Sequence, residues 1–408
     1  MATTIIITIT VLVLLAYFFD ITSSWTKLPS VILLLVVGWG LHYASGKFGY
    51  RIANLEPLLP ILGTIGLILI VLEGSLELDL NRKKIPILIK ASLGALLPLL
   101  AFVFGFAGFI NYYFDYSFQV SLINAIPLGV ISSAIAIPSA SNLPKEDQEL
   151  VIYESSLSDI FGVILFNFFT LNKIIDGEAT FEFTIDITLM IVISFTATVV
   201  LSMLIGRIEK HVKFMPILML VILIYAVAKE FHLPSLVFVM ILGLFLGNID
   251  EMVHLRFMHW LNPASLEKEV KRMKEILAEG SFLIRSLFFI LFGFLLNIRD
   301  LLNLKTMIWT LGIVVFILTL RTIQLLIMRI PMIPMVTLAP RGLITILLFL
   351  SIEPTNNIEI VNKSLIIQVI VVMAIIMTLG LMSYKKPTEA IVSKANPGPQ
   401  IPPISPQA

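Results

Sequence analysis

The sequence predicts an all-α polytopic membrane protein with about 13 transmembrane helices, and three observations lead to this fold class. Of the 408 residues, 58% are hydrophobic and only 13% are charged, whereas soluble domains contain about 25% charged residues. The apolar residues gather in runs of roughly 17–25, the length that crosses the hydrocarbon core as a helix. A β-barrel would instead have short alternating segments. A soluble enzyme is therefore excluded.

Thirteen apolar segments are expected to cross the membrane. The first segment has no Lys or Arg before it, and the first positive charge is Lys27. It therefore lacks the basic start of a secretory signal and is expected to be retained. The segments are 4–20, 28–44, 56–75, 85–110, 118–140, 148–170, 182–206, 213–229, 233–249, 281–297, 304–328, 335–352 and 364–384.

Two further segments differ from these spans in composition. Residues 250–280 combine many charges with apolar residues at helical spacing, which predicts an amphipathic helix on the membrane surface, with a soluble connector helix as the alternative. Residues 385–408, beyond the transmembrane domain at 1–384, are rich in proline and predict a disordered tail. Lys and Arg concentrate in the loops after odd-numbered spans and in this tail. The expected orientation in the cell inner membrane is therefore a cytoplasmic C-terminus and an outside N-terminus.

Several functions are excluded by residues that the chain lacks or does not arrange. The net charge of +1 provides no basic surface for nucleic acid. The absence of cysteine removes disulfides and thiolate metal sites, and the five histidines form no metal-ligand pattern. No cofactor or ATP motif occurs. We therefore expect no cofactor and no enzymatic activity, and an ion gradient as the driving force.

Ionisable residues inside the predicted spans indicate where function lies, because each costs about 3 kcal/mol on membrane-insertion scales. A helix bundle keeps such residues only where they face inward and are paired or hydrated. Lys90 is close enough to a span end to reach water. The remaining three acids and three bases are Glu73, Glu154, Asp159, Arg285, Arg321 and Arg341.

The sixth span contains two acids that point in different directions. Ser155 and Asp159 are about 40° apart on a helix and share a face, whereas Glu154 and Asp159 are about 140° apart. This favours one structural ion-pair partner and one carboxylate that faces a cavity. Asp159, flanked by the hydroxyls of Ser155 and Ser158, is the better cavity candidate. The alternative is that both acids are structural partners.

Proline interrupts two of the spans. Freed backbone groups at membrane depth are tolerated only beside protein or a cavity. The two spans are seven apart in order, so they run in opposite directions and fit inverted repeats at about 4–170 and 213–384, the arrangement that marks a transporter's substrate site. The prolines are Pro127, Pro138 and Pro144 in or just after the fifth span, and Pro331, Pro334 and Pro340 in or just before the twelfth.

Four fragments at these spans resemble the cation/proton antiporter superfamily, most closely the bacterial sodium/proton exchangers of the thirteen-helix, electroneutral type. Span three ends in IVLEGSLELDL, similar to the family's Phe-Glu-Gly-Gly-Leu element, and span six contains ESSLSD, similar to Glu-Ser-x-x-Asn-Asp. Span eleven carries Arg321, and span twelve contains PRGLITI, similar to a Leu-Arg-Gly element. The resemblance implies two broken crossing helices, a core domain beside a dimerisation or scaffold domain, and a homodimer in the lipid bilayer.

The resemblance also implies a role for each matching residue. Na⁺ would bind at Asp159, Ser155 and Glu73, with Asp159 carrying either the cation or the proton. Glu154 would form a structural ion pair with Arg321, and Arg341 would balance the helix ends at the crossing. The full set of implied ion- and proton-binding residues is Asp159, Ser155, Glu73, Ser158, Ser132 and Ser133.

The chain departs from the family pattern at three places. Ala134-Ile135-Ala136 stands where the family usually has Thr-Asp-Pro, so the acid that would balance the converging helix ends is missing. Ser158 replaces the Asn that usually precedes the essential Asp. Arg285 has no partner among the residues above, and a structural or snorkelling role is expected for it.

The expected function is the exchange of Na⁺ or Li⁺ for H⁺ by alternating access, with one proton per cation. A potassium/proton antiporter or potassium-efflux transporter of the same superfamily is the alternative, because only ion dependence separates the two. A sodium-coupled symporter for an organic anion would need a larger polar cavity at the crossing. An intramembrane hydrolase would need a catalytic cluster that the sequence lacks, and a channel would be distinguished by turnover and single-channel current.

Overall fold

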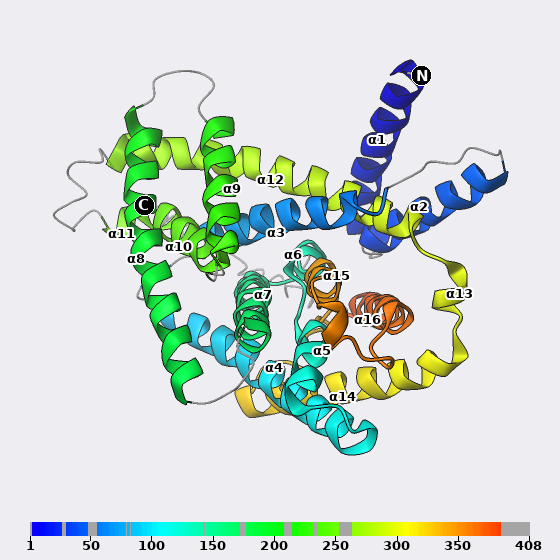
Figure 1. Ribbon diagram of the computed structural model, residues 1–408. Helices are drawn as coiled ribbons and strands as arrows, with labels where there is room; N and C mark the ends of the chain where they lie inside the picture. Colours follow the sequence, from blue (N-terminus) through cyan, green and yellow to red (C-terminus); the bar gives the residue numbers. More distant parts are fainter. Residues whose placement is uncertain are drawn as a thin grey trace, which may run out of the picture.

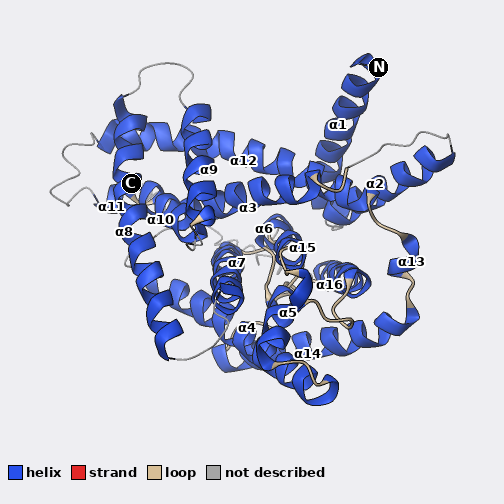
Figure 2. Ribbon diagram, viewed as in Figure 1, coloured by secondary structure: helices blue, strands red, loops and turns tan. Residues whose placement is uncertain are grey.

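The computed structural model describes residues 2–26, 30–47, 55–78, 80–81, 83–141, 143–171, 177–207, 214–231, 233, 235–252 and 263–384. Within these ranges the protein is all helix and loop, with no strand (Figures 1 and 2). This confirms the predicted all-α class. The Pro-rich tail at 385–408 and residues 253–262 of the predicted surface segment lie outside the described ranges.

The helices follow one another along the chain with short connections. They are α1 (Ala2–Thr26), α2 (Ser30–Lys47), α3 (Leu58–Glu77), α4 (Ile85–Phe114), α5 (Phe118–Gly129), α6 (Ser133–Ser139), α7 (Lys145–Leu171), α8 (Gly177–Arg207), α9 (Phe214–Glu230), α10 (Ser235–Gly247), α11 (Ile249–Met252), α12 (Pro263–Phe294), α13 (Ile298–Leu301), α14 (Leu304–Met328), α15 (Leu343–Leu350) and α16 (Lys363–Ser383), with a 3₁₀ turn at Pro354–Asn356. Among the described helices, seven are long and apolar enough to cross a membrane. The protein is therefore multi-pass, and the count of thirteen spans stays a prediction.

Helix α12 joins two segments that the sequence analysis separated at residue 280. The charged residues after Pro263 and the apolar residues up to Phe294 form one helix of 32 residues. Gly280 lies at the junction within this helix, and Leu277 and Ser281 on either side of it are both buried. In Figure 1 this long helix runs beside α3.

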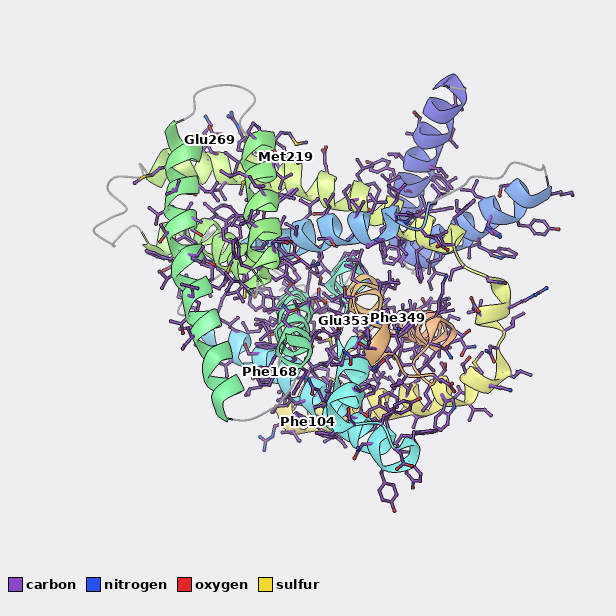
Figure 3. All side chains as sticks on the ribbon, in the orientation of Figure 1. Phe104, Phe168, Met219, Glu269, Phe349 and Glu353 are labelled. Carbon is purple, nitrogen blue, oxygen red and sulfur yellow. The ribbon has the colours of Figure 1, made fainter. Side chains whose placement is uncertain are left out.

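The helices pack as two groups. The scaffold bundle contains α1–α3, α8–α10 and α12, and the core bundle contains α4–α7 and α14–α16. Helix α3 makes most of the contacts between them, touching α6, α7 and α15. Side chains fill the spaces between the helices (Figure 3).

Glycines allow close helix packing in the scaffold bundle, as is common in membranes. Gly243 and Gly247 are four residues apart on α10 and face α3. A Cβ at Gly247 would lie 2.6 Å from the carbonyl oxygen of Leu76. Gly38 of α2 and Gly293 of α12 lie against each other's backbones in the same way.

The predicted interruption of the fifth span is present, whereas the predicted twelfth span is helical only in its second half. Helix α5 ends at Gly129 and α6 begins at Ser133, while α14 and α15 are separated by the non-helical stretch 330–342. Pro127 and Pro138 lie inside α5 and α6 rather than at the break. The two interruptions meet in space.

Candidate functional site

The backbone amides of residues 131–133 lie in the break between α5 and α6 or at the first residue of α6, and each has a partner. The amide of Ile131 donates to the Ser158 hydroxyl oxygen over 2.9 Å. The amide of Ser132 donates to the Pro340 carbonyl, also over 2.9 Å, which joins the two interrupted spans. These bonds satisfy polar groups that the break removes from the helical ladder.

The Ser133 amide, the third of the set, is held by Asp159 of α7. It donates to Asp159 Oδ2 over 3.3 Å, and the Ser133 hydroxyl donates to the same oxygen. The carboxylate therefore lies at the N-terminus of α6, where an anion is favourable. In this way Asp159 supplies a negative charge at the crossing, where the chain has Ala134-Ile135-Ala136 instead of an acid.

The second oxygen of Asp159 is the unusual feature of the site. Asp159 is 3% exposed, and its Oδ1 is buried without a hydrogen-bond partner among the described residues. A buried polar atom without a partner is costly. A proton or a cation on Oδ1 would relieve that cost, so this atom is the best candidate for ion binding in the core bundle.

Arg341 lies on the opposite side of the break and binds the carbonyls that α5 leaves free. Its guanidinium donates to Leu128 O over 2.9 Å, to Gly129 O over 3.1 Å and to Ala339 O over 2.6 Å. A cation at the C-terminus of α5 complements the helix dipole. The crossing is thus balanced by Arg341 at one helix end and Asp159 at the other.

Glu154 and Arg321 form a buried ion pair between α7 and α14. Arg321 Nη1 bonds Glu154 Oε1, and Nη2 bonds Oε2 over 2.7 Å. Gln324 accepts from Arg321 Nη1 and donates to Glu154 Oε1, both over 2.8 Å. Both carboxylate oxygens of Glu154 therefore have partners, whereas only Oδ2 of Asp159 has them.

Other residues of the implied ion-binding set are less directly connected to Asp159. The Ser155 hydroxyl donates to Val151 O of its own helix over 2.7 Å, and the Ser158 hydroxyl holds the Ile131 amide. Glu73 lies on α3 and is partly exposed. Its neighbour Gly74 packs against Ser156 of α7, so Glu73 lies where the scaffold bundle meets the helix that carries Asp159.

Arg285 of α12 reaches across the boundary between the bundles. Its Nη1 donates to the carbonyl of Ala134 in α6 over 3.3 Å. It also lies within electrostatic reach of the carboxylates of Glu73 and Asp20. No partner of Arg285 is evident from the sequence, and the structure provides one, the Ala134 carbonyl, next to Ser133.

Two residues of the ion-pair cluster are missing from the candidates of the sequence analysis. Gln324 lies one turn beyond Arg321 on α14 and could have been found from that spacing. Gly94 of α4 faces the cluster, and a Cβ there would lie 2.7 Å from both Gln324 Nε2 and Glu154 Oε1. That requirement depends on how α4 packs and is not visible in the sequence.

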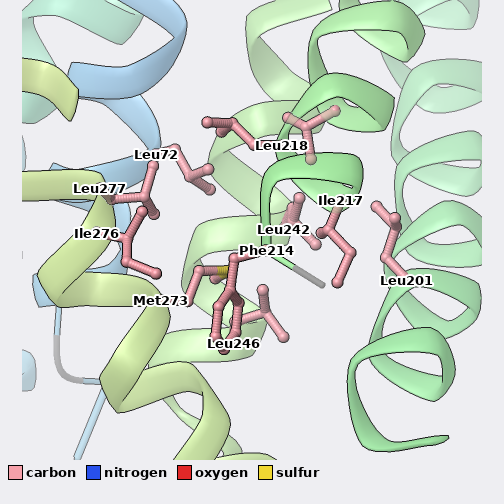
Figure 4. A pocket seen from close by; sticks show the side chains of 11 residues that line it. Leu72, Leu201, Phe214, Ile217, Leu218, Leu242, Leu246, Met273, Ile276 and Leu277 are labelled. Atoms are coloured by element: carbon pink, nitrogen blue, oxygen red, sulfur yellow. The ribbon is translucent and has the colours of Figure 1, made fainter. Parts of the chain in front are cut away.

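Two pockets differ sharply in polarity. A pocket of about 280 Å³ between the bundles is lined by Asn167 and Thr170 of α7, Lys229 of α9, and Val163, which is one turn beyond Asp159. A second pocket, between α3, α8, α9, α10 and α12, has only apolar lining side chains (Figure 4). Only the first suits an ion or water. In the described part of the chain, no three His, Asp or Glu side chains gather as they would around a resident metal ion.

Comparison with known proteins points to one family. Residues 9–383 match the family model described as sodium/hydrogen exchanger, transmembrane. The fold is similar to the structure of the sodium proton antiporter MjNhaP1 from Methanocaldococcus jannaschii at pH 8, with a TM-score of 0.68, 17% identity, and coverage of 93% of this chain and 99% of that one. A structure of MjNhaP1 from electron microscopy gives a TM-score of 0.67, again at 17% identity, covering 95% of this chain and 100% of that one. A search of curated protein sequences found no match.

Proposed function

The chain belongs to the sodium/hydrogen exchanger family, and we propose that this cation/proton antiporter exchanges Na⁺ or Li⁺ for H⁺ with Asp159 as the carrier. Membership of a family of antiporters makes it a transporter rather than an enzyme. The observation that carries the proposal is the buried, unpartnered Oδ1 of Asp159. The neighbouring acid Glu154 is the poorer candidate, because Arg321 and Gln324 occupy both of its oxygens.

The proposed mechanism is competition at one carboxylate. A proton and a cation both neutralise Asp159, and each disfavours the other. Because Asp159 alone exchanges its proton for the cation, the exchange is one proton per cation and electroneutral. In the cation-bound form, Ser155 and Glu73 complete the Na⁺ site, while Ser132, Ser133 and Ser158 hold the broken helix around it.

Alternating access requires the site to open to each side in turn, and rocking of one bundle against the other provides this. The polar pocket between the bundles supports an access route from one side of the membrane, because its lining residue Val163 is one turn from Asp159.

We propose that the protein functions as a homodimer in a cell inner membrane, with the C-terminus in the cytoplasm, the N-terminus outside, and no cofactor.

Exchange of K⁺ for H⁺ is the second candidate. The residues that depart from the family pattern, Ser158 and Ala134-Ile135-Ala136, lie at the crossing where the cation would bind. They therefore support K⁺ as an alternative to Na⁺ or Li⁺. The two candidates share the fold and the carrier and differ only in the ion that drives proton movement.

The test uses purified protein in liposomes that contain a pH-sensitive dye. Gradients of Na⁺, Li⁺ and K⁺ are imposed in turn on the wild type, on Asp159→Asn and on Asp147→Asn, a matched control in the first turn of α7. We expect proton movement driven by Na⁺ or Li⁺ that is lost in Asp159→Asn and kept in the control. Exchange that persists in Asp159→Asn would refute the carrier assignment, and a response to K⁺ alone would select the second candidate.

A further inference from the structure

Two consecutive residues at the start of α6 connect the proposed carrier to the scaffold bundle. The amide and hydroxyl of Ser133 hold Asp159, while the carbonyl of Ala134 accepts from Arg285. Since α6 has seven residues between two breaks in regular structure, a displacement of its first turn would change both contacts together.

Arg285 belongs to the scaffold bundle, whereas Ala134 belongs to the core bundle. A hydrogen bond between them therefore crosses the boundary at which the bundles have to move during alternating access. The donor is a guanidinium, and hydrogen bonds to charged groups are among the stronger ones in proteins. This contact resists separation of α6 from α12.

Arg285 also faces polar groups on the scaffold side. The carboxylate of Glu73 is within its electrostatic reach. On α12 itself, the hydroxyl of Ser281, one turn earlier, faces the carboxylate of Glu73, and the hydroxyl of Ser286 is buried without a partner among the described residues. The guanidinium thus contacts the half-helix that holds Asp159 and interacts electrostatically with Glu73, a proposed cation ligand.

We propose that Arg285 is a positioning residue that latches α6 to the scaffold bundle between Glu73 and the Ala134 carbonyl, and that binding of the transported cation at Glu73 releases this latch. The inference rests on the proposed function. A cation at Glu73 repels the guanidinium, and movement of Arg285 frees the first turn of α6. Arg285 therefore links occupancy of the ion site to motion between the bundles.

The latch has a measurable consequence for cation affinity. If the latched form binds the cation poorly, the apparent affinity is reduced by the fraction of protein that is latched. Loss of a hydrogen bond to a charged group is sufficient for about a tenfold change. Arg285→Gln should therefore lower the half-saturating Na⁺ concentration by about tenfold, whereas Arg285→Lys, which retains the charge, should change it less.

The experiment measures exchange in liposomes as a function of Na⁺ for the wild type, Arg285→Gln, Arg285→Lys and Arg299→Gln. Arg299 is an exposed arginine of α13 and serves as the control for loss of one positive charge. A purely structural role for Arg285 would reduce turnover and thermal stability without increasing cation affinity. An unchanged or higher half-saturating Na⁺ concentration in Arg285→Gln would overturn the latch.

A second measurement keeps Arg285 intact and so does not depend on the folding of its variants. The natural chain has no cysteine, and a Cβ at Gly74 of α3 would lie 3.5 Å from the Cβ of Ser156 of α7. In a Gly74→Cys/Ser156→Cys protein, saturating Na⁺ should slow disulfide formation at least threefold relative to choline. Arg285 is intact in this protein, and equal rates of disulfide formation in Na⁺ and in choline would count against the latch. A wild type that exchanges no cation would instead refute the proposed function itself.

Discussion

The buried pair Glu154–Arg321 allows a quantitative test of how the core bundle is held together. The variants are Glu154→Gln, Arg321→Gln and the double variant. Their free energies of unfolding are compared with those of Glu149→Gln, Lys84→Gln and the corresponding double variant. The side chains of the buried pair are 4% and 2% exposed. Those of Lys84 and Glu149, at 3.1 Å, are 32% and 38% exposed.

The magnitude follows from burial. Removing one partner of a buried pair leaves an uncompensated charge and costs about 3–5 kcal/mol, whereas replacing both partners costs much less. Both singles in the buried pair should therefore lose about 3–5 kcal/mol, and the double variant should recover at least about 2 kcal/mol of the summed loss. The exposed pair should couple by about 1 kcal/mol or less.

The assay is reversible unfolding in mixed detergent micelles, followed by circular dichroism, with a double-mutant cycle for each pair. Gln324, which contacts both Glu154 and Arg321, is kept in all variants of the buried pair. The reasoning would be refuted if the coupling energy of Glu154 and Arg321 were no larger than that of Lys84 and Glu149. Exchange activity intact in the Glu154→Gln protein would separately support its structural role.

Three further predictions test the packing around the crossing. Gly94→Ala should lower the free energy of unfolding by about 1–3 kcal/mol, because the added methyl overpacks a buried polar cluster; thermal denaturation checks this, and wild-type stability would contradict the contact. Oxidation of the Gly74→Cys/Ser156→Cys protein should stop exchange, and reduction should restore it, because the disulfide joins the two bundles at a suitable Cβ separation. Exchange that continues after complete cross-linking would exclude relative motion of α3 and α7. Arg341→Lys should abolish most exchange and lower the free energy of unfolding by about 1–3 kcal/mol, because an ammonium group cannot bind all three carbonyls that the guanidinium binds. Full exchange activity of this variant in liposomes would argue against a role of Arg341 at the crossing.

Much of the fold was predictable from the amino-acid composition and from the length of the apolar runs. Apolar runs of spanning length predicted the all-helical class, and prolines predicted which two spans are interrupted. The prolines did not locate the interruption, because Pro127 and Pro138 both lie within helices. Its position depends on where Ser158, Asp159 and Pro340 can receive the freed amides, and that is a property of the assembled bundle.

The candidate site was less accessible from the sequence. Helical spacing indicated that Glu154 and Asp159 point in different directions, and the ionisable residues within spans formed a short set of candidates. Three-dimensional packing then decided their partners. The hydrogen bond from Arg285 to the Ala134 carbonyl is one example. Every residue has a backbone carbonyl, so the sequence does not indicate which carbonyl accepts.

The bond between Ser132 and Pro340 has a consequence for how this protein is made. The two residues are about 200 positions apart, and at roughly 5–20 residues per second the ribosome needs about 10–40 s to produce the second after the first. During that interval the Ser132 amide in the nascent chain lacks its final acceptor. The first half of the protein is therefore expected to enter the bilayer incompletely satisfied, held by water, by the insertion machinery or by a temporary contact. A chain truncated before residue 340 should remain susceptible to proteolysis even with α5, α6 and α7 already in place.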